Sequence, residues 1–250
     1  MSRGYQVLPL VYDRWQRSYG RDYSSLILPR VLKSIKRHEV QRGSIVDIAC
    51  GTGTLALAMA RRGWRTWGVD ASALMVEEAL RKRRPPAMAG FLRQDMRRLH
   101  LPEQVHVATC MFDSMNHLRS LREMGRTFSA VAAALQPGGL FIFDLNNEHC
   151  YQTLWTRTEA IHQRDFTLIM QNTYHAKRQT GYALVTVFLR RRKGYARLTE
   201  VIQERHFPPA LVESLLRKSG FRVLEREEFN FTRIKEIGEI KTWWVARKTP

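Results

Sequence analysis

Short apolar runs alternate with stretches of helical periodicity between residues 44 and 144. The runs predict strands at 44–49, 65–69, 88–92, 104–111 and 140–144, and the periodic stretches predict helices at 54–62, 72–83 and 118–135. This alternation indicates an α/β fold with a doubly wound parallel sheet. Ligands bind such sheets at the carboxyl ends of the strands, so side chains at those ends are the first candidates for a site.

The pattern changes after residue 147. Alternating or β-branched runs at 166–174, 182–189 and 196–205 predict a small antiparallel meander. Two prolines then open a helix that ends at Lys218, and strands at 221–229 and 239–247 finish the main sheet as an antiparallel pair. Trp243 and Trp244 are expected to be packing residues of that last strand. Leu135 is followed by a predicted turn at residues 137–139.

Four segments follow from these boundaries. An N-terminal aromatic lid and helix occupies residues 1–40, and a nucleotide-binding core occupies 41–148. An antiparallel β insert occupies 149–206, and a C-terminal helix and closing hairpin occupies 207–250. The helix of the first segment is expected to run to His38 with Ser24 as its cap. Tyrosines at 5, 12, 19 and 23 suit a lid over a charged ligand, since each offers an apolar ring and a polar tip, although they would equally form a packed cap on the sheet.

A glycine turn follows the first predicted strand. Gly51 and Gly53 stand where the backbone must turn sharply, and the next helix points its free N–H groups at whatever binds there. The spacing also fits a loose dinucleotide fingerprint, but Asp47 would repel a pyrophosphate and suit a cationic group. Asp70 closes the second strand, where a carboxylate can accept both hydroxyls of a ribose, and Asp95 follows the third strand, where an adenine edge would lie.

The ordered set of motifs resembles the class I S-adenosylmethionine-dependent methyltransferases. It consists of Asp-Ile-Ala-Cys-Gly-Thr-Gly at 47–53, Gly-Val-Asp at 68–70, Gln-Asp-Met at 94–96, Asp-Ser-Met-Asn-His-Leu at 113–118, the run from Leu135 to Asn146, and the closing Trp-Trp-Val-Ala-Arg. The resemblance covers nearly the whole chain and is to the small-molecule type, such as sugar-amine and glycine N-methyltransferases. It implies a Rossmann-like seven-stranded sheet with an antiparallel last strand, a β insert after the fifth strand, and S-adenosyl-L-methionine as cofactor.

The resemblance also assigns roles to residues. The cofactor-binding set is Tyr12, Tyr23, Asp47, Ala49, Gly51, Gly53, Asp70, Ala71, Met75, Asp95, Met96, Met111 and Phe112, and the catalytic set is His117 and Tyr12. His117 matches a histidine that reaches the acceptor in sugar-amine N-methyltransferases, and an imidazole titrates where it can take a proton from an ammonium or hydroxyl. Alternatively, His117 is a half-exposed histidine with a structural role only. Other candidates to orient the acceptor are Asn116, Asn146, Asn147 and His206.

Composition narrows the partners. The three cysteines are too few and too scattered for a disulfide framework or a zinc site, and no metal-spaced cluster appears. No signal peptide or membrane segment is expected, so the cytoplasm is the expected compartment. A monomer or homodimer is expected. The net charge of +18 favours a polyanion, but the basic residues are spread out as on solvated faces. A small-molecule acceptor is therefore preferred over RNA. A non-catalytic cofactor-binding module remains open, whereas a nicotinamide dehydrogenase does not fit Asp47.

Overall fold

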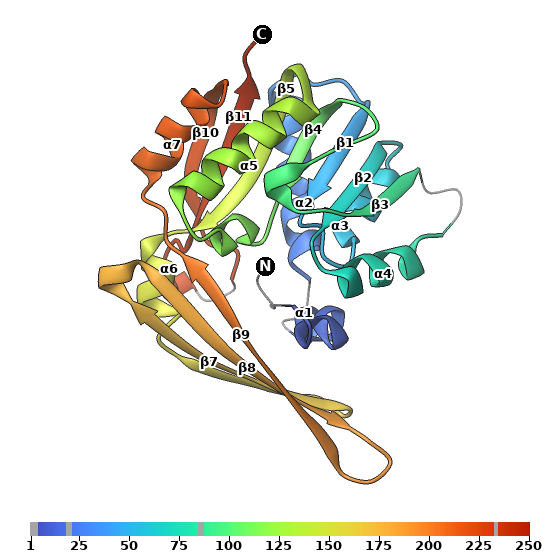
Figure 1. Ribbon diagram of the computed structural model, residues 1–250, viewed down its shortest axis with the longest axis vertical. Coiled ribbons are helices and arrows are strands. Elements are labelled where there is room, and N and C mark those ends of the chain that lie inside the picture. The colour runs from blue at the N-terminus through green and yellow to red at the C-terminus, as the bar shows by residue number, and fades with distance from the viewer. Residues whose placement is uncertain (1–4, 19–21, 85–87, 233–234) are drawn as a thin grey trace.

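A seven-stranded mixed sheet forms the body of the molecule (Figure 1). The computed structural model describes residues 5–18, 22–84, 88–232 and 235–250, so Tyr19 of the predicted lid lies outside the described residues. The strands are β1 (Ser44–Ile48), β2 (Arg65–Asp70), β3 (Ala89–Arg93), β4 (Val105–Cys110), β5 (Leu135–Asn146), β10 (Phe221–Phe229) and β11 (Lys241–Lys248). Their order is β10-β11-β5-β4-β1-β2-β3, and β11 runs antiparallel to both of its neighbours, as predicted.

Helices cover both faces of this sheet. One face carries α2 (Tyr23–Arg37) and α3 (Thr54–Ala60), with α4 (Ala73–Lys82) packed beside α3. The other face carries α5 (Leu121–Ala134) and α7 (Pro209–Lys218). Trp243 packs on the first of these faces and Trp244 on the second, because successive side chains of a strand point to opposite faces, and both are fully buried. The prediction that they are packing residues is confirmed.

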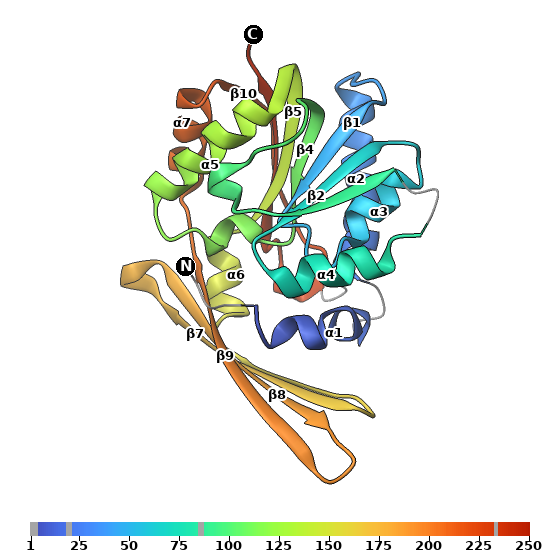
Figure 2. The ribbon, with the colours of Figure 1, turned by 45° about the vertical axis from the view of Figure 1, so that its right-hand side comes forward.

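The insert is a second sheet that projects from the body as a long, twisted arm (Figure 1). It consists of β6 (Thr158–His162), β7 (Phe166–His175), β8 (Thr180–Arg190) and β9 (Tyr195–Arg205), in that order. Its inner face buries Val185 and Leu168 against Leu8 and Val11 of the N-terminal segment. Helix α1 (Tyr12–Ser18) consequently lies between the body and the arm (Figure 2).

Several predicted boundaries were wrong. The insert has four strands rather than three, and α6 (Glu148–Thr153) precedes them. Asp22, not Ser24, caps α2, since its carboxylate accepts the Ser25 N–H at 2.9 Å. Strand β5 begins at Leu135 and includes the residues predicted as a turn, so α5 ends one residue earlier than expected.

Short 3₁₀ turns complete the chain. They are η1 (Leu8–Leu10), η2 (Met96–Arg98), η3 (Ser114–His117), η4 (Ala176–Arg178) and η5 (Lys235–Ile237). Turn η3 comes just before the predicted helix 118–135, and Ser120 caps α5 after it. His117 therefore lies in the connection that follows β4 and not on a long helix.

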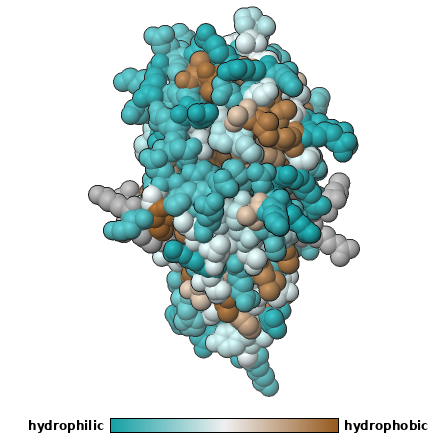
Figure 3. Space-filling model, turned by 90° about the vertical axis from the view of Figure 1, so that its left-hand side faces the viewer, coloured by the Kyte–Doolittle hydropathy of each residue, from teal (hydrophilic) through white to brown (hydrophobic). Residues whose placement is uncertain are grey.

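The face shown in Figure 3 is mostly hydrophilic, and its apolar side chains form separate small patches. Over the described residues, every helix is too short or too polar to cross a membrane.

Candidate active site

A cavity of about 880 Å³ opens at the carboxyl ends of β1, β2 and β4. Nearly all residues predicted for the site line it: Tyr12, Tyr23, Asp47, Ala49, Gly51, Asp70, Ala71, Met75, Asp95, Met96, Met111, Phe112 and His117. The exception is Gly53. The volume lies within the range of roughly 300–1,000 Å³ that is usual for small-molecule sites.

The turn after β1 is held in a left-handed backbone conformation. Ala49, Gly51 and Gly53 have φ angles of +53°, +53° and +75°. A Cβ on Gly51 would meet only the Tyr12 ring, at 3.8 Å, so this glycine is open towards the cavity. A Cβ on Gly53 would lie 2.7 Å from the Phe91 ring, so this glycine is required by packing, and its N–H bonds the Cys50 carbonyl at 2.9 Å.

Asp70 braces the turn from the end of β2. Its carboxylate accepts the Gly51 N–H at 2.9 Å and the Ser72 N–H at 2.8 Å. Burial raises the pKa of this carboxyl, while the backbone donors from Ser72 and Gly51 oppose the rise. The two oxygens therefore sit at the cavity wall with their positions fixed by the main chain.

Asp47 lies deeper, at 4% exposure, and accepts a hydrogen bond from the Thr109 hydroxyl at 2.8 Å. Burial raises its pKa from 3.8 to about 7, and the charge of Asp70 adds to that rise. A buried carboxylate with few donors favours a cation brought close to it.

The carboxylate of Asp95 already has a partner. Arg97 donates to it through Nε at 2.9 Å and Nη2 at 2.5 Å, and also binds Glu123 at 2.6 Å. The Arg97 contact lowers the pKa of Asp95. Met75 and Met96 also line the cavity and supply apolar surface to its wall.

Helix α1 is latched onto the glycine turn. Lys82 of α4 donates to Asp13 at 2.7 Å and to the Thr52 hydroxyl at 2.8 Å, and Thr52 itself donates to Asp13 at 2.5 Å. Asp13 thereby holds Tyr12 over Gly51. The tyrosine hydroxyl resists ionisation, since burial raises its pKa and the charges of Asp113 and Asp70 raise it further.

Tyr23 lines the cavity with its ring but uses its hydroxyl elsewhere. The hydroxyl donates to Asp144 at 2.7 Å, and the ring lies 4.7 Å from that of Phe112. Asp144 is fully buried and also accepts the Lys241 ammonium at 2.9 Å. Tyr23 thus connects α2 to the charged cluster at the end of β5.

His117 lines the cavity from η3, and both of its ring nitrogens have partners. Nδ1 faces the Gln203 carbonyl at 3.3 Å, and because a carbonyl oxygen only accepts, Nδ1 carries the proton. Nε2 lies 3.0 Å from the Tyr5 hydroxyl and 3.7 Å from Glu204. Burial lowers the pKa of His117, against the opposing charge of Asp113, so the neutral ring is favoured and Nε2 can accept a proton.

The sequence did not predict the parts played by Tyr5 and Gln203, which complete the surroundings of His117. Tyr5 was included in the lid because of its ring, but its pairing with a histidine 112 positions away has no local signal. Its left-handed φ of +63° is an unusual conformation for a tyrosine, and the contact with His117 is one of the interactions that hold it.

The other predicted polar residues do not line the cavity. Asn116 accepts the Asn146 N–H at 2.9 Å and donates to the Arg205 carbonyl at 2.8 Å, so it joins η3 to β5 and β9. Asn147 caps α6. His206 is buried beside Tyr151, away from the cavity.

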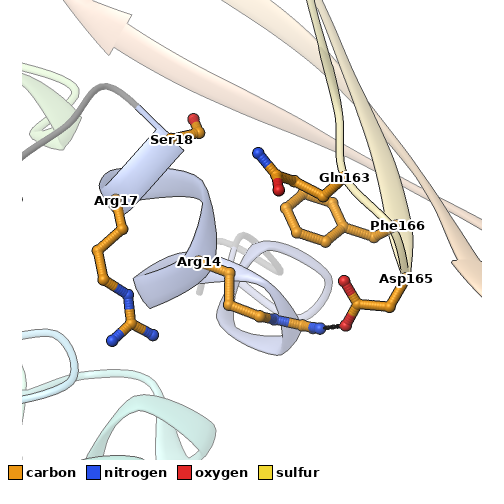
Figure 4. Close-up of a pocket in the computed structure, with 6 residues that line it drawn as sticks. All are labelled: Arg14, Arg17, Ser18, Gln163, Asp165 and Phe166. Carbon is orange, nitrogen blue, oxygen red and sulfur yellow. Dashed lines mark ion pairs between the residues drawn. The ribbon is translucent and has the colours of Figure 1, made fainter.

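A smaller hollow of about 240 Å³ lies where α1 meets the turn between β6 and β7 (Figure 4). Arg14 reaches across it, pairs with Asp165 and covers the ring of Phe166 at 5.0 Å, whereas Arg17 extends away from the turn. Because Arg14 is already paired, we interpret the hollow as the seam between lid and insert.

Comparison with known proteins agrees with this geometry. A family described as a methyltransferase domain matches residues 45–139. The Bacillus subtilis protein YqeM, named as a methyltransferase, is 27% identical over 89% of this chain and 91% of its own length. A dTDP-3-amino-3,4,6-trideoxy-alpha-D-glucopyranose N,N-dimethyltransferase of Streptomyces venezuelae is 30% identical, over 54% of this chain and 55% of that protein. Glycine N-methyltransferase of Mus musculus is 26% identical over 47% of this chain and 44% of that protein, so the chain spans about half the length of these two relatives.

Solved structures share the fold over nearly the full length. An S-adenosylmethionine-dependent methyltransferase from Clostridium acetobutylicum superposes with a TM-score of 0.82 at 20% identity, covering 96% of this chain and 99% of that one. DesVI of Streptomyces venezuelae superposes with a TM-score of 0.77 at 23% identity, covering 98% and 100%. Both alignments include the insert and the N-terminal segment, since so little of either chain is left out.

Proposed function

This chain belongs to the class I S-adenosylmethionine-dependent methyltransferases, and we propose that it methylates a nitrogen or oxygen atom of a small-molecule acceptor. When bound, S-adenosylmethionine supplies a methyl group already activated on a sulfonium. The protein then has to hold the acceptor in line, exclude water and receive a proton. The observation that carries the proposal is the position of the His117 imidazole, which lines the same cavity as the cofactor residues and has Nδ1 against the Gln203 carbonyl.

The residues of the turn fit the cofactor. Gly51 presents an open backbone, Asp70 offers a fixed carboxylate for ribose hydroxyls, and Asp47 offers a buried one near an ammonium. Met75 and Met96 provide an apolar surface for a purine.

The end of the cavity near His117 is lined by two further segments. Tyr5 and Gln6 cover it from the N-terminal segment, and Ile202 and Gln203 bound it from β9. The segment is fixed there because Glu200 accepts the N–H groups of Gln6 and Leu8 at 2.8 and 2.7 Å. A cavity of this size, lined by the N-terminal segment and β9, suits a small acceptor, and it supports the assignment more strongly than net charge does.

An amine is the acceptor we favour. Two of the relatives are named for N-methylation, of an amino sugar and of glycine. A neutral imidazole can take the proton that an ammonium must lose before its nitrogen attacks. Tyr5, hydrogen-bonded to Nε2, would pass that proton on or orient the amine.

RNA is the second candidate, favoured by the net charge of +18 and by Arg93, Arg97 and Arg119 on the cavity wall. Arg97, however, is held by Asp95 and Glu123. A base would also have to enter beneath the lid, so we place RNA second.

Calorimetric titration with S-adenosylhomocysteine, with NADH as control, tests the cofactor. We expect micromolar binding of the first and none of the second, and a loss of roughly 1–3 kcal/mol in Asp70→Ala, because stranded donors are costly. Release of S-adenosylhomocysteine from S-adenosylmethionine in the presence of amino sugars, glycine, their hydroxyl analogues or RNA then identifies the acceptor. His117→Asn should lower turnover without changing cofactor affinity, while turnover with RNA alone, or none at all, would reject the proposal.

A further inference from the structure

Four charged side chains are buried behind His117, and their charges do not cancel. Asp113, Asp144 and Glu204 are 15%, 0% and 4% exposed, and the ammonium among them, Lys241, is 1% exposed. Three ionised carboxylates would therefore surround one cation. A buried excess of negative charge is relieved when one carboxyl keeps its proton.

The Lys241 ammonium and backbone N–H groups supply most of the hydrogen-bond donors to the Asp144 carboxylate. This carboxylate accepts the Lys241 ammonium at 2.9 Å and the N–H groups of Phe112 and Asp113, both at 2.8 Å, together with the Tyr23 hydroxyl. All four partners donate, so Asp144 is an acceptor in each of these contacts, through both of its oxygens.

Asp113 and Glu204 lie close together, with one carboxylate oxygen of each within 4.8 Å of the other. Asp113 accepts Lys241 at 2.8 Å, while Glu204 Oε2 accepts Asn146 at 3.0 Å and Tyr151 at 3.1 Å. Two ionised carboxylates this close in a buried site repel each other, and a proton on one of them removes that repulsion. Because Asp113 pairs with the Lys241 ammonium whereas the donors to Glu204 are neutral, we assign the proton to Glu204. The directions agree: burial and then the charge of Asp113 raise the pKa of Glu204, and Lys241 lowers that of Asp113 against the effect of burial.

This pair lies directly against the imidazole. One ligand-type atom from each of Asp113, His117 and Glu204 lies within 4.8 Å of the others, and Glu204 Oε1 is 3.7 Å from Nε2. The spacing would also permit a metal ion, but the Lys241 ammonium already occupies Asp113. The ring also faces the Tyr5 hydroxyl and the Gln203 carbonyl.

We propose that Asp113 and Glu204 share one proton and act as a positioning pair for His117, keeping a single negative charge beside the ring so that the imidazolium is stabilised. In the reaction the acceptor ammonium loses a proton to Nε2, the ring gains one positive charge, and the shared proton stays within the pair. The inference rests on the proposed function only in taking His117 as the base. The pair offsets both burial of the ring and the unfavourable charge of Lys241.

Infrared spectroscopy tests the shared proton without any turnover. The experiment uses the Asp47→Asn background, because the pKa of Asp47 is about 7 and its carboxyl would also absorb at neutral pH. In that background we expect the carbonyl stretch of a protonated carboxylic acid, and we expect Glu204→Gln to remove it. Glu225→Gln is the control, because Glu225 is also buried but is paired with His38 at 2.7 Å and Arg37 at 3.2 Å. A missing band, or one that survives Glu204→Gln, overturns the proposal.

Titration of the His117 ring by NMR tests the coupling, with His117→Asn used to assign the signal. Glu204→Gln and Asp113→Asn should each shift the His117 pKa little, because the partner carboxyl retains the charge. The double variant should lower it by about 1 unit or more. A full shift in Glu204→Gln alone would mean that Glu204 is ionised, and no shift in the double variant would mean that the pair does not act on the ring.

The controls separate this proposal from the proposed function. Thermal unfolding shows whether the double variant folds, and if it does not, the infrared band and the Glu204→Gln titration decide. Both readouts come from the unliganded protein, so failure to find an acceptor leaves them intact. Conversely, amine methylation with no shared proton would reject only the pair.

Discussion

At the residue scale, the buried carboxyl of Asp47 lowers the free energy of unfolding when it is ionised. Its carboxyl is buried with Thr109 as its side-chain donor, and its pKa is raised from 3.8 to about 7 by burial. The folded state therefore binds a proton that the unfolded state has already lost between those two pH values. Stability falls as pH rises through that window, which is the reverse of a salt-bridged aspartate.

Asp47→Asn should relieve this penalty, since the amide oxygen can still accept the Thr109 hydroxyl. We expect the variant to be more stable than the parent by roughly 2–4 kcal/mol at pH 8 and to lose that advantage as pH falls towards 4. Denaturant unfolding across pH measures it. Cofactor affinity should decrease in the same variant, and a gain in stability that does not depend on pH would contradict the buried-charge explanation.

Gly53 and Gly138 differ in why a glycine is needed: for backbone conformation alone at Gly138, and for packing as well at Gly53. Both have left-handed backbones, with φ of +75° and +77°, but a Cβ at Gly53 would press on Phe91 and Ala79 whereas one at Gly138 meets nothing within 4 Å. Gly138→Ala should cost roughly 1–2 kcal/mol from the backbone alone, and Gly53→Ala a further 1–3 kcal/mol from overpacking. Urea unfolding gives both values. Equal costs would show that Phe91 moves aside freely.

At the scale of elements, the short helix α1 is fastened on two sides. Asp13 joins it to α4 through Lys82, and Arg14 joins it to the insert through Asp165. Each of these partly exposed ion pairs is worth little in solvent, so the main apolar contact that opening would have to break is that of Trp15 with the insert. We therefore expect ligand exchange to proceed through movement of α1.

Lys82→Met should let the lid open more often. We expect S-adenosylhomocysteine to dissociate roughly 2–10-fold faster, as loss of about 0.5–1.5 kcal/mol implies. Stopped-flow displacement measures the rate. Arg81→Met is the matched control, since Arg81 is exposed and pairs with Glu78 inside α4. Identical rates in the two variants would show that the latch does not control release.

The features that depend on local sequence patterns could be predicted. Asp47 and Asp70 follow apolar runs, and the carboxyl ends of parallel strands meet at one edge, so their convergence was predictable. Strand β6 was missed because its residues are exposed or half-exposed and carry no apolar alternation. Asn116 was a candidate for the acceptor because it is polar and near His117, but its buried side chain serves backbone groups.

Contacts between distant segments could not be predicted. Lys241 reaches Asp113 across 128 positions, and Glu204 reaches Asn146 across 58. Neither residue stands in a motif, and a lone lysine or glutamate in a strand is ordinarily solvent-exposed. The register of β11 against β5 and the packing of β9 against η3 decide their positions.

At the scale of the whole molecule, basic residues gather at a place remote from the site. The net charge is +18, and the turn between β8 and β9 exposes Arg191, Arg192 and Lys193 at the far end of the arm. Such a tip attracts polyanions through phosphate contacts and counterion release. The cavity and the basic tip lie apart, so RNA binding at the tip can be tested separately from methylation in the cavity.

RNA should bind weakly, with an affinity that falls steeply as salt rises, and without changing S-adenosylhomocysteine affinity. Replacing Arg191, Arg192 and Lys193 by alanine should reduce the salt dependence, by about one unit of slope for each phosphate that the variant no longer neutralises. Filter binding at several salt concentrations measures this. RNA that tightens cofactor binding at physiological salt, or that is itself methylated, would move RNA to first place.

The position of strand β11 in the sheet affects the order in which the parts of the protein can fold. Lys241 neutralises Asp144, which precedes it by 97 positions, and its strand fills the gap between β5 and β10. While the chain emerges from the ribosome, β5 waits with one open edge and its acidic end has no counter-ion. The charged cluster behind His117 is therefore completed only when this last strand joins the sheet.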